Sequence, residues 1–286
     1  MGLKDKLDRI LTEPYEPALN EYRSVVDAYV IANIFDGKQL QGARGFQHSC
    51  LHRVRNSIFN QVYLYPATTT KTAEKDLKRI TAIPNPTSVK WNWPLTAEES
   101  GKLDIKTGFT KDFLEDHIPV ALINQTISHI RLWDVCIERN QPIAILNSNT
   151  VLRGDIETLE YIQFRGFVNG VVGLNSLNDE THNNKYLFDQ LSRLYNTQAG
   201  QNSKLHSTPS VEFADIGITK PQPFPGHAAY LITPWAARRA FEVVQEVGLW
   251  PIQFLLCRQL CPWTYLMWPQ TIETKQALSP TRKIKR

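Results

Sequence analysis

Three small polar residues, Asn147, Ser148 and Asn149, follow the short apolar run Ile143–Leu146. The run I-A-I-L predicts a buried strand with an exit loop directly after it. Carboxylates in such a loop could hold a divalent cation, but amide and hydroxyl groups lack the negative charge that a hard cation needs. The residue types therefore favour hydrogen bonding over metal binding at this strand end.

A second polar group, Ser128, His129 and Arg131, lies on the segment that precedes this strand. Apolar residues at helical spacing predict a helix from Pro119 to Asn140, where Asn140-Gln141-Pro142 would stop it. A second helix is predicted to open at Pro234, a residue suited to the first turn, and to run to Val247. His129 could bond to a neighbouring strand within the core, or it could contact a ligand, and both interpretations remain open. Because adjacent helical residues diverge by about 100°, Ser128 and His129 do not suit a nucleophile and its base.

The N-terminal part of the chain predicts a parallel sheet that would place these groups. Val25–Ile31 and Gln61–Tyr65 are strand candidates, and Gln39–Asn60 between them has apolar residues at near-helical spacing. A strand, a helix and a strand in this order form a βαβ unit. Ligands of such sheets bind at the carboxyl ends of strands, which here lead into the loops Ala32–Gly37 and Pro66–Thr70.

Residues Thr68–Asp116 form a long polar excursion from the predicted sheet. Excursions of this length are often functional loops or lids. Trp91 and Trp93 could stack on the apolar face of an acceptor sugar, or they could pin the excursion to the body of the protein. Thr96-x-x-Glu99 is a helix-start signature within this segment.

Composition excludes several classes of protein. The 286 residues are 42% hydrophobic with a net charge of +4, and the excess is concentrated in Lys275–Arg286, which holds five basic side chains and no acid. The remaining body is close to neutral, which argues against a nucleic-acid binder, although the tail could reach an acidic protein partner. The most hydrophobic window, Leu249–Trp268, contains Arg258 and two prolines and predicts a buried segment, not a transmembrane one.

The cysteines indicate a reducing compartment. Cys50, Cys136, Cys257 and Cys261 are too few and too irregularly spaced for a disulfide framework. We expect reduced thiols in the core and a cytoplasmic location, or a place within a larger assembly. The charged N-terminus M-G-L-K-D-K-L-D does not resemble a signal peptide.

Four segments in order resemble glycosyltransferase family 25, which includes lipopolysaccharide glycosyltransferases and collagen galactosyltransferases. They are I-S-H-I-R-L-W-D (Ile127–Asp134), I-A-I-L (Ile143–Leu146), G-H-A-A-Y-L-I-T-P-W-A-A (Gly226–Ala237) and W-P-I-Q-F (Trp250–Phe254). The resemblance implies an α/β fold of GT-A type, a Rossmann-like, mixed and mostly parallel sheet flanked by helices. We expect one such domain over residues 25–274, after a helical extension at 1–24 and before a basic tail at 275–286.

The resemblance also implies a nucleotide-sugar donor, most often a UDP-sugar, and a glycan acceptor. Family members are expected to bridge the donor diphosphate with Mn²⁺ or Mg²⁺, which neutralises the charge of the leaving group. The acceptor candidates are Trp91 and Trp93. The donor-site candidates are Ala32, Asn33, Ser128, His129, Arg131, His227 and Tyr230.

The departures from the family pattern fall on the acids. Asn147, Ser148 and Asn149 occupy the Glu-Asp-Asp positions, and Gln253 occupies the position of the Asp in Pro-x-Asp. We therefore expect no bound metal and a metal-dependent catalysis that is lost or altered, unless Asp155, Glu157 or Asp179 folds back beside Asn149.

Three interpretations remain. The first is a metal-independent transferase in which side chains such as Arg131, His129, His227 or Arg238 neutralise the phosphates. The second is a catalytically silent relative that binds a nucleotide, a glycan or a protein. The third is a relative recruited as a structural or assembly subunit.

Overall fold

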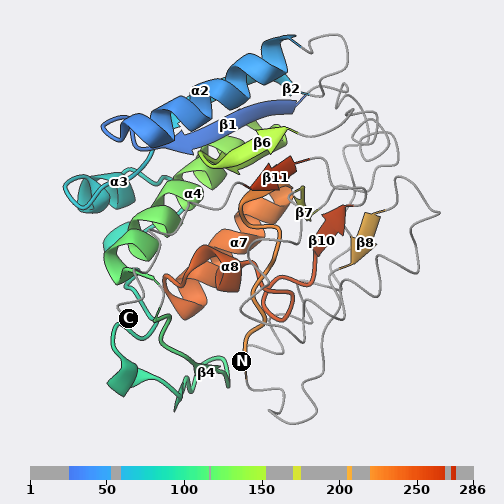
Figure 1. Cartoon of the computed structure of the whole chain (residues 1–286). Helices are drawn as coiled ribbons and strands as arrows, with labels where there is room; N and C mark the ends of the chain where they lie inside the picture. Colours follow the sequence, from blue (N-terminus) through green and yellow to red (C-terminus); the bar gives the residue numbers. More distant parts are fainter. Residues whose placement is uncertain are drawn as a thin grey trace, which may run out of the picture.

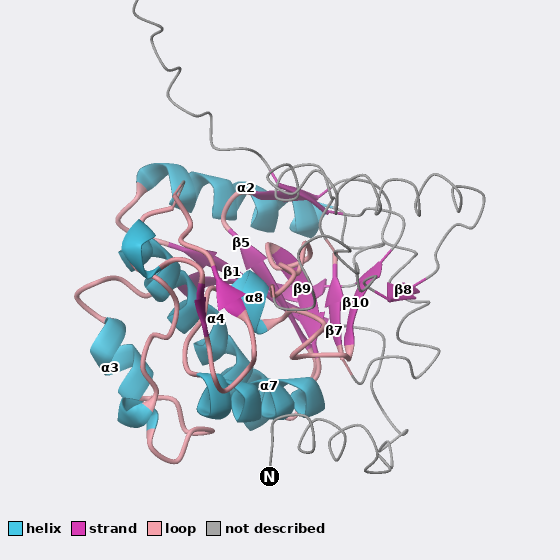
Figure 2. Cartoon of the chain, turned by 90° about the horizontal axis from the view of Figure 1, so that it is seen from below, coloured by secondary structure: helices cyan, strands magenta, loops and turns pink. Residues whose placement is uncertain are grey.

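The computed structural model describes residues 26–52, 59–115, 117–152, 170–174, 205–207, 220–267 and 272–274. The predicted N-terminal extension at 1–24, the basic tail at 275–286 and the acids Asp155, Glu157 and Asp179 lie outside these ranges. The described residues form a central sheet with helices on both faces (Figures 1 and 2).

The main sheet is mixed, with strand order β2-β1-β5-β9-β7-β10-β8. Strands β2, β1, β5, β7 and β10 run in one direction, and β9 and β8 run in the other. The mixed, mostly parallel sheet flanked by helices that the sequence predicts is therefore confirmed. In sheet order the strands are Phe59–Pro66, Val26–Ala32, Ile143–Asn147, Ala229–Ile232, Val171–Gly173, Thr264–Met267 and Leu205–Ser207.

Alternating side chains of the strands form two separate cores, because successive residues of a strand point to opposite faces. On one face, strand residues such as Val30 and Leu146 form a core with Ala43 and Phe46 of α2 (Gly37–His52). On the other face, residues such as Ile145 pack with α4, α7 and α8. These helices span Pro119–Arg139, Pro234–Val247 and Ile252–Leu255. Figure 2 shows α2 on one side of the sheet and α4 and α7 on the other.

The two predicted helices of the second face are confirmed. The helix α4 ends at Asn140, whose φ of 48° is left-handed, and this geometry stops a helix where the sequence predicts the stop. The helix α7 starts at Pro234 behind Thr233, whose hydroxyl accepts a hydrogen bond from the amide of Ala236. The predicted helix Gln39–Asn60 is wrong at its end, because Asn60 belongs to strand β2.

The excursion between β2 and α4 is ordered by short elements and one buried ion pair. Helix α3 (Ala73–Lys78), the 3-10 turns η1 (Pro86–Ser88) and η2 (Ala97–Glu99), and a hairpin of β3 (Lys102–Leu103) and β4 (Thr110–Lys111) follow one another. Lys111 Nζ lies 2.5 Å from Asp104 Oδ2, with both side chains less than 9% exposed. A second small sheet pairs β6 (Thr150–Leu152) with β11 (Ile272–Thr274).

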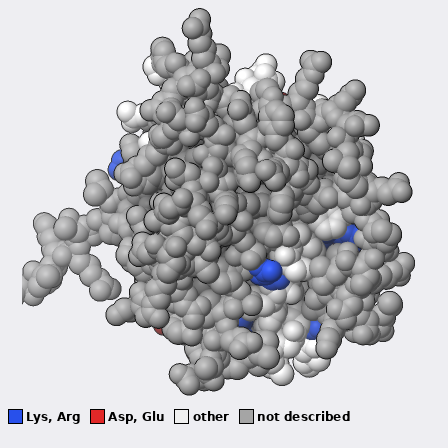
Figure 3. Space-filling model, turned by 90° about the vertical axis from the view of Figure 1, so that its right-hand side faces the viewer, with Lys and Arg blue, Asp and Glu red and all other residues white. Residues whose placement is uncertain are grey.

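The buried thiols and the surface charge agree with the composition. All four cysteines are free and buried, and burial raises the pKa of the Cys257 thiol to about 12. In the described part of the face shown in Figure 3, the Lys and Arg side chains lie at separate places and do not gather into one patch. Among the described residues no helix is long and apolar enough to cross a membrane.

Candidate functional site

The carboxyl ends of three parallel strands meet at one edge of the sheet. Ala32 of β1 pairs in register with Pro66 of β2, and Ile31 pairs with Asn147 of β5. The carboxyl end of β7 and the start of the antiparallel β9 reach the same edge, since Gly173 pairs with Tyr230 and the amide of Asn147 donates to the carbonyl of Ala228. Five strands therefore reach the edge of the sheet at which the sequence predicts a site.

Glycine allows the closest approach at this edge. A Cβ on Gly226 would lie 2.5 Å from Cα of Gly173 and 2.4 Å from the ring of Phe224. Any side chain at Gly226 would push the start of β9 away from β7. The G-H-A-A segment therefore needs its glycine to bring His227 and Tyr230 against the centre of the sheet.

Three fully buried side chains from α4 and β9 form a hydrogen-bonded group, which we call the His129 triad. Tyr230 Oη accepts a hydrogen bond from Trp133 Nε1 at 3.0 Å and lies 2.9 Å from His129 Nδ1. Residues 129 and 133 are one turn apart and so share a helix face. Their spacing explains why the Ser-His-x-x-x-Trp pattern occurs on a helix that packs against this strand.

The bonds of the triad favour the neutral tautomer of His129 that carries its proton on Nε2. Indole Nε1–H can only donate, so the Tyr230 oxygen accepts from Trp133, and the Tyr230 hydroxyl proton finds an acceptor within the triad only when His129 Nδ1 is bare. Burial and then His227 lower the pKa of His129, and a hydrogen-bonding interaction with the side chain of Asn147 raises it in part, so that it lies at about 3. His129 Nε2 is buried and has no partner at full hydrogen-bond distance, so the interaction with Asn147 is a long one. In the favoured tautomer a neutral N–H group beside Asn147 is therefore available to a closer acceptor.

Other donor-site candidates are used within the protein. Ser128 Oγ accepts from the amide of Thr68 at 2.8 Å and donates to the carbonyl of Asn124. Arg131 forms an ion pair with Asp76 at 3.2 Å, and its guanidinium lies over the ring of Tyr65. Both side chains hold the loop after β2 and helix α3 against α4.

The loop after β1 is also closed by its own side chains. Asn33 Oδ1 accepts from the amide of Phe35, and the amide of Asn33 donates to Gln39 Oε1. Asp36 Oδ1 accepts from the amides of Lys38 and Gln39 at the start of α2. Ala32, the last residue of β1, is buried. Asn33 thus builds the turn, while the neighbouring Phe35 is 86% exposed.

His227 and Gln253 lie close to the triad through Phe224. His227 Nδ1 is 3.0 Å from the carbonyl of Phe224, the amide of Phe224 donates to the carbonyl of Gln253, and the ring of Phe224 packs edge-on against Tyr230. Gln253 is 8% exposed, and its Oε1 makes no hydrogen bond. The site therefore contains a buried donor without a partner at His129 and a buried acceptor without a partner at Gln253.

Helix α2 packs directly on the strand-end loop. A Cβ on Gly42 would lie 2.4 Å from the carbonyl oxygen of Ser148, so only glycine permits this approach. Asn147 and Ser148 are half-buried there, and Asn149 is exposed. Gly42 is not among the residues that the sequence predicts for the site. A glycine inside an otherwise helical segment is the one signal that could have identified it.

The two tryptophans of the excursion have different environments. Trp93 is 5% exposed, stacks on Phe254 at 4.3 Å between ring centroids, and donates to the carbonyl of Asp112. Trp91 is half-buried and pairs as an isolated bridge with Leu249. Trp93 therefore pins the excursion to the body, whereas Trp91 lines a cavity that the strand-end residues do not share.

The strand-end residues do not fit a divalent cation. Asn147, Ser148, Asn149 and Gln253 offer neutral oxygens, and Mn²⁺ or Mg²⁺ sites depend on carboxylates. Within the described ranges, no group of three or more His, Cys, Asp or Glu side chains could hold a metal ion. The metal that the family resemblance implies has no ligand set among these residues, so no chemical step is assigned to it.

Comparisons with known proteins give little further information. No protein-family model matches the sequence. No curated protein matches it either. Among solved structures, mouse xyloside xylosyltransferase 1 in its apo form is similar over 81% of this chain and 80% of that chain, with 8% identity and a TM-score of 0.33. A TM-score this low does not establish a shared fold.

Proposed function

We propose that this is a glycosyltransferase-like protein, resembling family 25 and of GT-A type, whose strand-end site binds a nucleotide sugar without a divalent cation. The observation that carries the proposal is the buried Nε2 of neutral His129, which lies beside Asn147 and has no partner at full hydrogen-bond distance. Two acids of the family pattern would be replaced by neutral groups of similar size at Asn147 and Gln253. Such a site favours uncharged hydroxyl and carbonyl oxygens over a hydrated cation.

The charges of the described residues favour binding over transfer. A departing nucleoside diphosphate needs a cation beside it. Arg131 is paired with Asp76, and His129 is neutral, so neither is free to neutralise a leaving group. Metal-independent transfer through these two side chains is thus disfavoured, and the site would retain donor recognition.

The test is a binding screen with UDP-, GDP- and CMP-sugars, each with Mn²⁺ and with a chelator, read by thermal shift and then by calorimetry. We expect one nucleotide class to bind equally well under both conditions. The matched variant is His129→Asn, whose amide oxygen can still accept from Tyr230 but which has no group at the position of Nε2. We expect it to fold and to bind about tenfold more weakly, as the loss of one buried hydrogen bond requires.

A second variant tests the assignment of positions. Asn147→Glu, Asn149→Asp and Gln253→Asp together restore the acids of the family pattern. Binding of the same nucleotide that now depends on Mn²⁺ would support both the register and the family resemblance. Mn²⁺-dependent binding by the unmodified protein would contradict the proposal.

A structural or assembly role is the second candidate, and the packing of α2 favours it. The contact of Gly42 with Ser148 brings a helix onto the strand-end loop, and Ser128 and Arg131 are engaged internally. Failure of every nucleotide sugar to bind, with and without Mn²⁺, would favour this role over donor recognition.

A further inference from the structure

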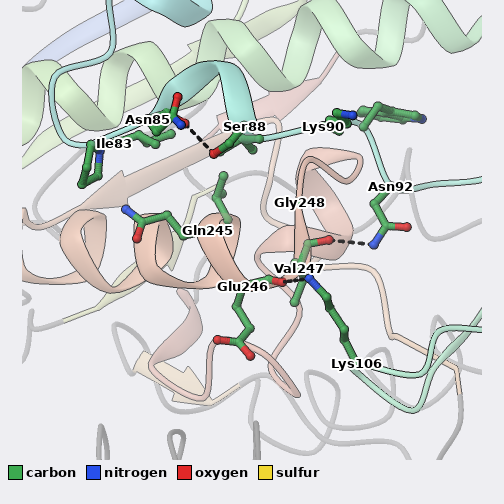
Figure 4. A pocket seen from close by; sticks show the side chains of 14 residues that line it. Ile83, Asn85, Ser88, Lys90, Asn92, Lys106, Gln245, Glu246, Val247 and Gly248 are labelled. Carbon is green, nitrogen blue, oxygen red and sulfur yellow. Dashed lines mark hydrogen bonds between the residues drawn. The ribbon is translucent and has the colours of Figure 1, made fainter.

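A cavity of about 560 Å³ lies between the excursion and the carboxyl end of α7 (Figure 4). Its lining comes from residues 83–92 and 244–248 and from Lys106. The lining includes neither His129 nor the loop at 147–149. Its size is within the range of small-molecule sites, which usually measure about 300–1,000 Å³.

The walls of the cavity are fixed by bonds between distant segments. Asn92 Nδ2 donates to the carbonyl of Val247 at 2.8 Å, and Lys106 Nζ donates to the carbonyl of Glu246 at 3.3 Å. The amide of Leu249 donates to the carbonyl of Lys90. Gly248 has a φ of 86°, and a Cβ there would lie 2.7 Å from that same carbonyl. The cavity is therefore preformed, with the last carbonyls of α7 already paired.

The lining combines an apolar floor with a neutral polar rim. Four buried side chains lie at the floor: Ile83, Val89, Val244 and Val247. The rim carries amide and hydroxyl groups of Asn85, Ser88 and Gln245, and its charges are mixed in sign, because Lys90, Lys106 and Glu246 also line the cavity and Lys106 reaches the backbone of Glu246. A pyranose matches this distribution, because it has an apolar C–H face and hydroxyl groups around its edge.

Trp91 adds an independent indication of a ligand. It lines the cavity, and its Nε1–H is buried without a hydrogen-bond partner. Most buried polar groups of proteins have a partner, so an unpaired indole N–H beside a cavity needs an explanation. A hydroxyl oxygen of a bound sugar would supply one, and the indole ring would supply the surface on which a pyranose packs.

We propose that this cavity, the Trp91 cavity, is a carbohydrate-binding site for a neutral sugar. The role of that sugar, which would be the glycan acceptor, rests on the function proposed above. Binding itself depends on the Trp91 cavity and not on the strand-end site.

The test uses three neutral probes: the methyl β-glycosides of glucose, galactose and xylose. We expect at least one to bind the full chain in the millimolar range, measured by saturation-transfer and chemical-shift titration. Gln245→Trp, at an exposed rim position, should fill the cavity and abolish binding. Trp91→Ala should weaken binding about tenfold, and Trp91→Phe, which keeps a ring but lacks the N–H, should weaken it by less.

Two controls make the outcome decisive. Glu242→Ala changes an exposed residue of α7 outside the cavity and should leave binding unchanged. His129→Asn should weaken nucleotide binding and leave glycoside binding intact, so failure of the two proposals can be distinguished. Absence of saturable binding by all three glycosides would overturn the proposal. Binding that survives both Gln245→Trp and Trp91→Ala would overturn it as well.

Discussion

Replacing Tyr230 by Phe removes one oxygen from the centre of the His129 triad and leaves the ring in place. The hydroxyl serves two buried partners, Trp133 Nε1 and His129 Nδ1. Each buried polar group that loses its partner costs about 1–3 kcal/mol, so for the two partners we expect a loss of about 2–6 kcal/mol in the free energy of unfolding. The ring is retained, so no cavity contributes to this value. The same change frees the tautomer of His129, and nucleotide affinity should therefore fall as well.

Tyr29→Phe is the matched control, because Tyr29 is a buried tyrosine whose hydroxyl has no partner. Its removal should leave the free energy of unfolding unchanged or raise it by up to about 1 kcal/mol. Both variants are compared with the unmodified chain by urea unfolding, followed by circular dichroism and by fluorescence. If Tyr230→Phe lowers the free energy of unfolding by no more than Tyr29→Phe does, the Tyr230 hydroxyl does not make the two hydrogen bonds of the triad. The donor assigned to His129 Nε2 would then be wrong as well.

Three further predictions concern the free energy of unfolding. Gly42→Ala should destabilise the protein by at least about 1 kcal/mol in urea unfolding, because the new Cβ meets the Ser148 carbonyl. Gly45→Ala on the same helix is the control. Its Cβ has open space, so it should stabilise the protein by about 0.5–1 kcal/mol. Asp104→Asn should cost about 3–5 kcal/mol by the same measurement, because it leaves the ammonium of Lys111 buried without its counter-charge. Between about pH 6.5 and about pH 3, His129 takes up a proton in the unfolded chain but not in the folded protein. Lowering the pH through this range should therefore reduce the free energy of unfolding. The decrease should be steeper in the unmodified protein than in His129→Asn by about 1.4 kcal/mol per pH unit.

The helices and the parallel core could be predicted because their signals are local. Pro119–Asn140 and Pro234–Val247 each combine apolar periodicity with a start or stop residue, and both are confirmed to within one residue. The strand, helix and strand at the N-terminus likewise predict the parallel pair of β1 and β2. The insertion of β9 between β5 and β7 was not predictable, because strand order depends on pairing between distant segments.

The candidate site shows the same difference between local signals and contacts of distant segments. The sequence proposes Ser128 and Arg131 for donor binding, but in the structure they bond to Thr68 and Asp76, which are more than fifty residues away in the chain. Spacing within α4 contains no information about such partners. Consequently the sequence identifies polar residues near the site and does not separate those that bind a ligand from those that hold a loop.

The uncharged side chain at position 147 and the neutrality of His129 are physically coupled. A carboxylate at position 147 would raise the pKa of the buried ring of His129, because an opposite charge nearby favours the protonated form. The result would be an ion pair inside the sheet, and the Tyr230 hydroxyl would no longer have a bare Nδ1 to which it could donate. The neutral amide of Asn147 raises this pKa only in part, so burial holds it at about 3 and the ring stays neutral. Asn147 and the His129 triad therefore form one consistent arrangement of neutral hydrogen-bonding groups.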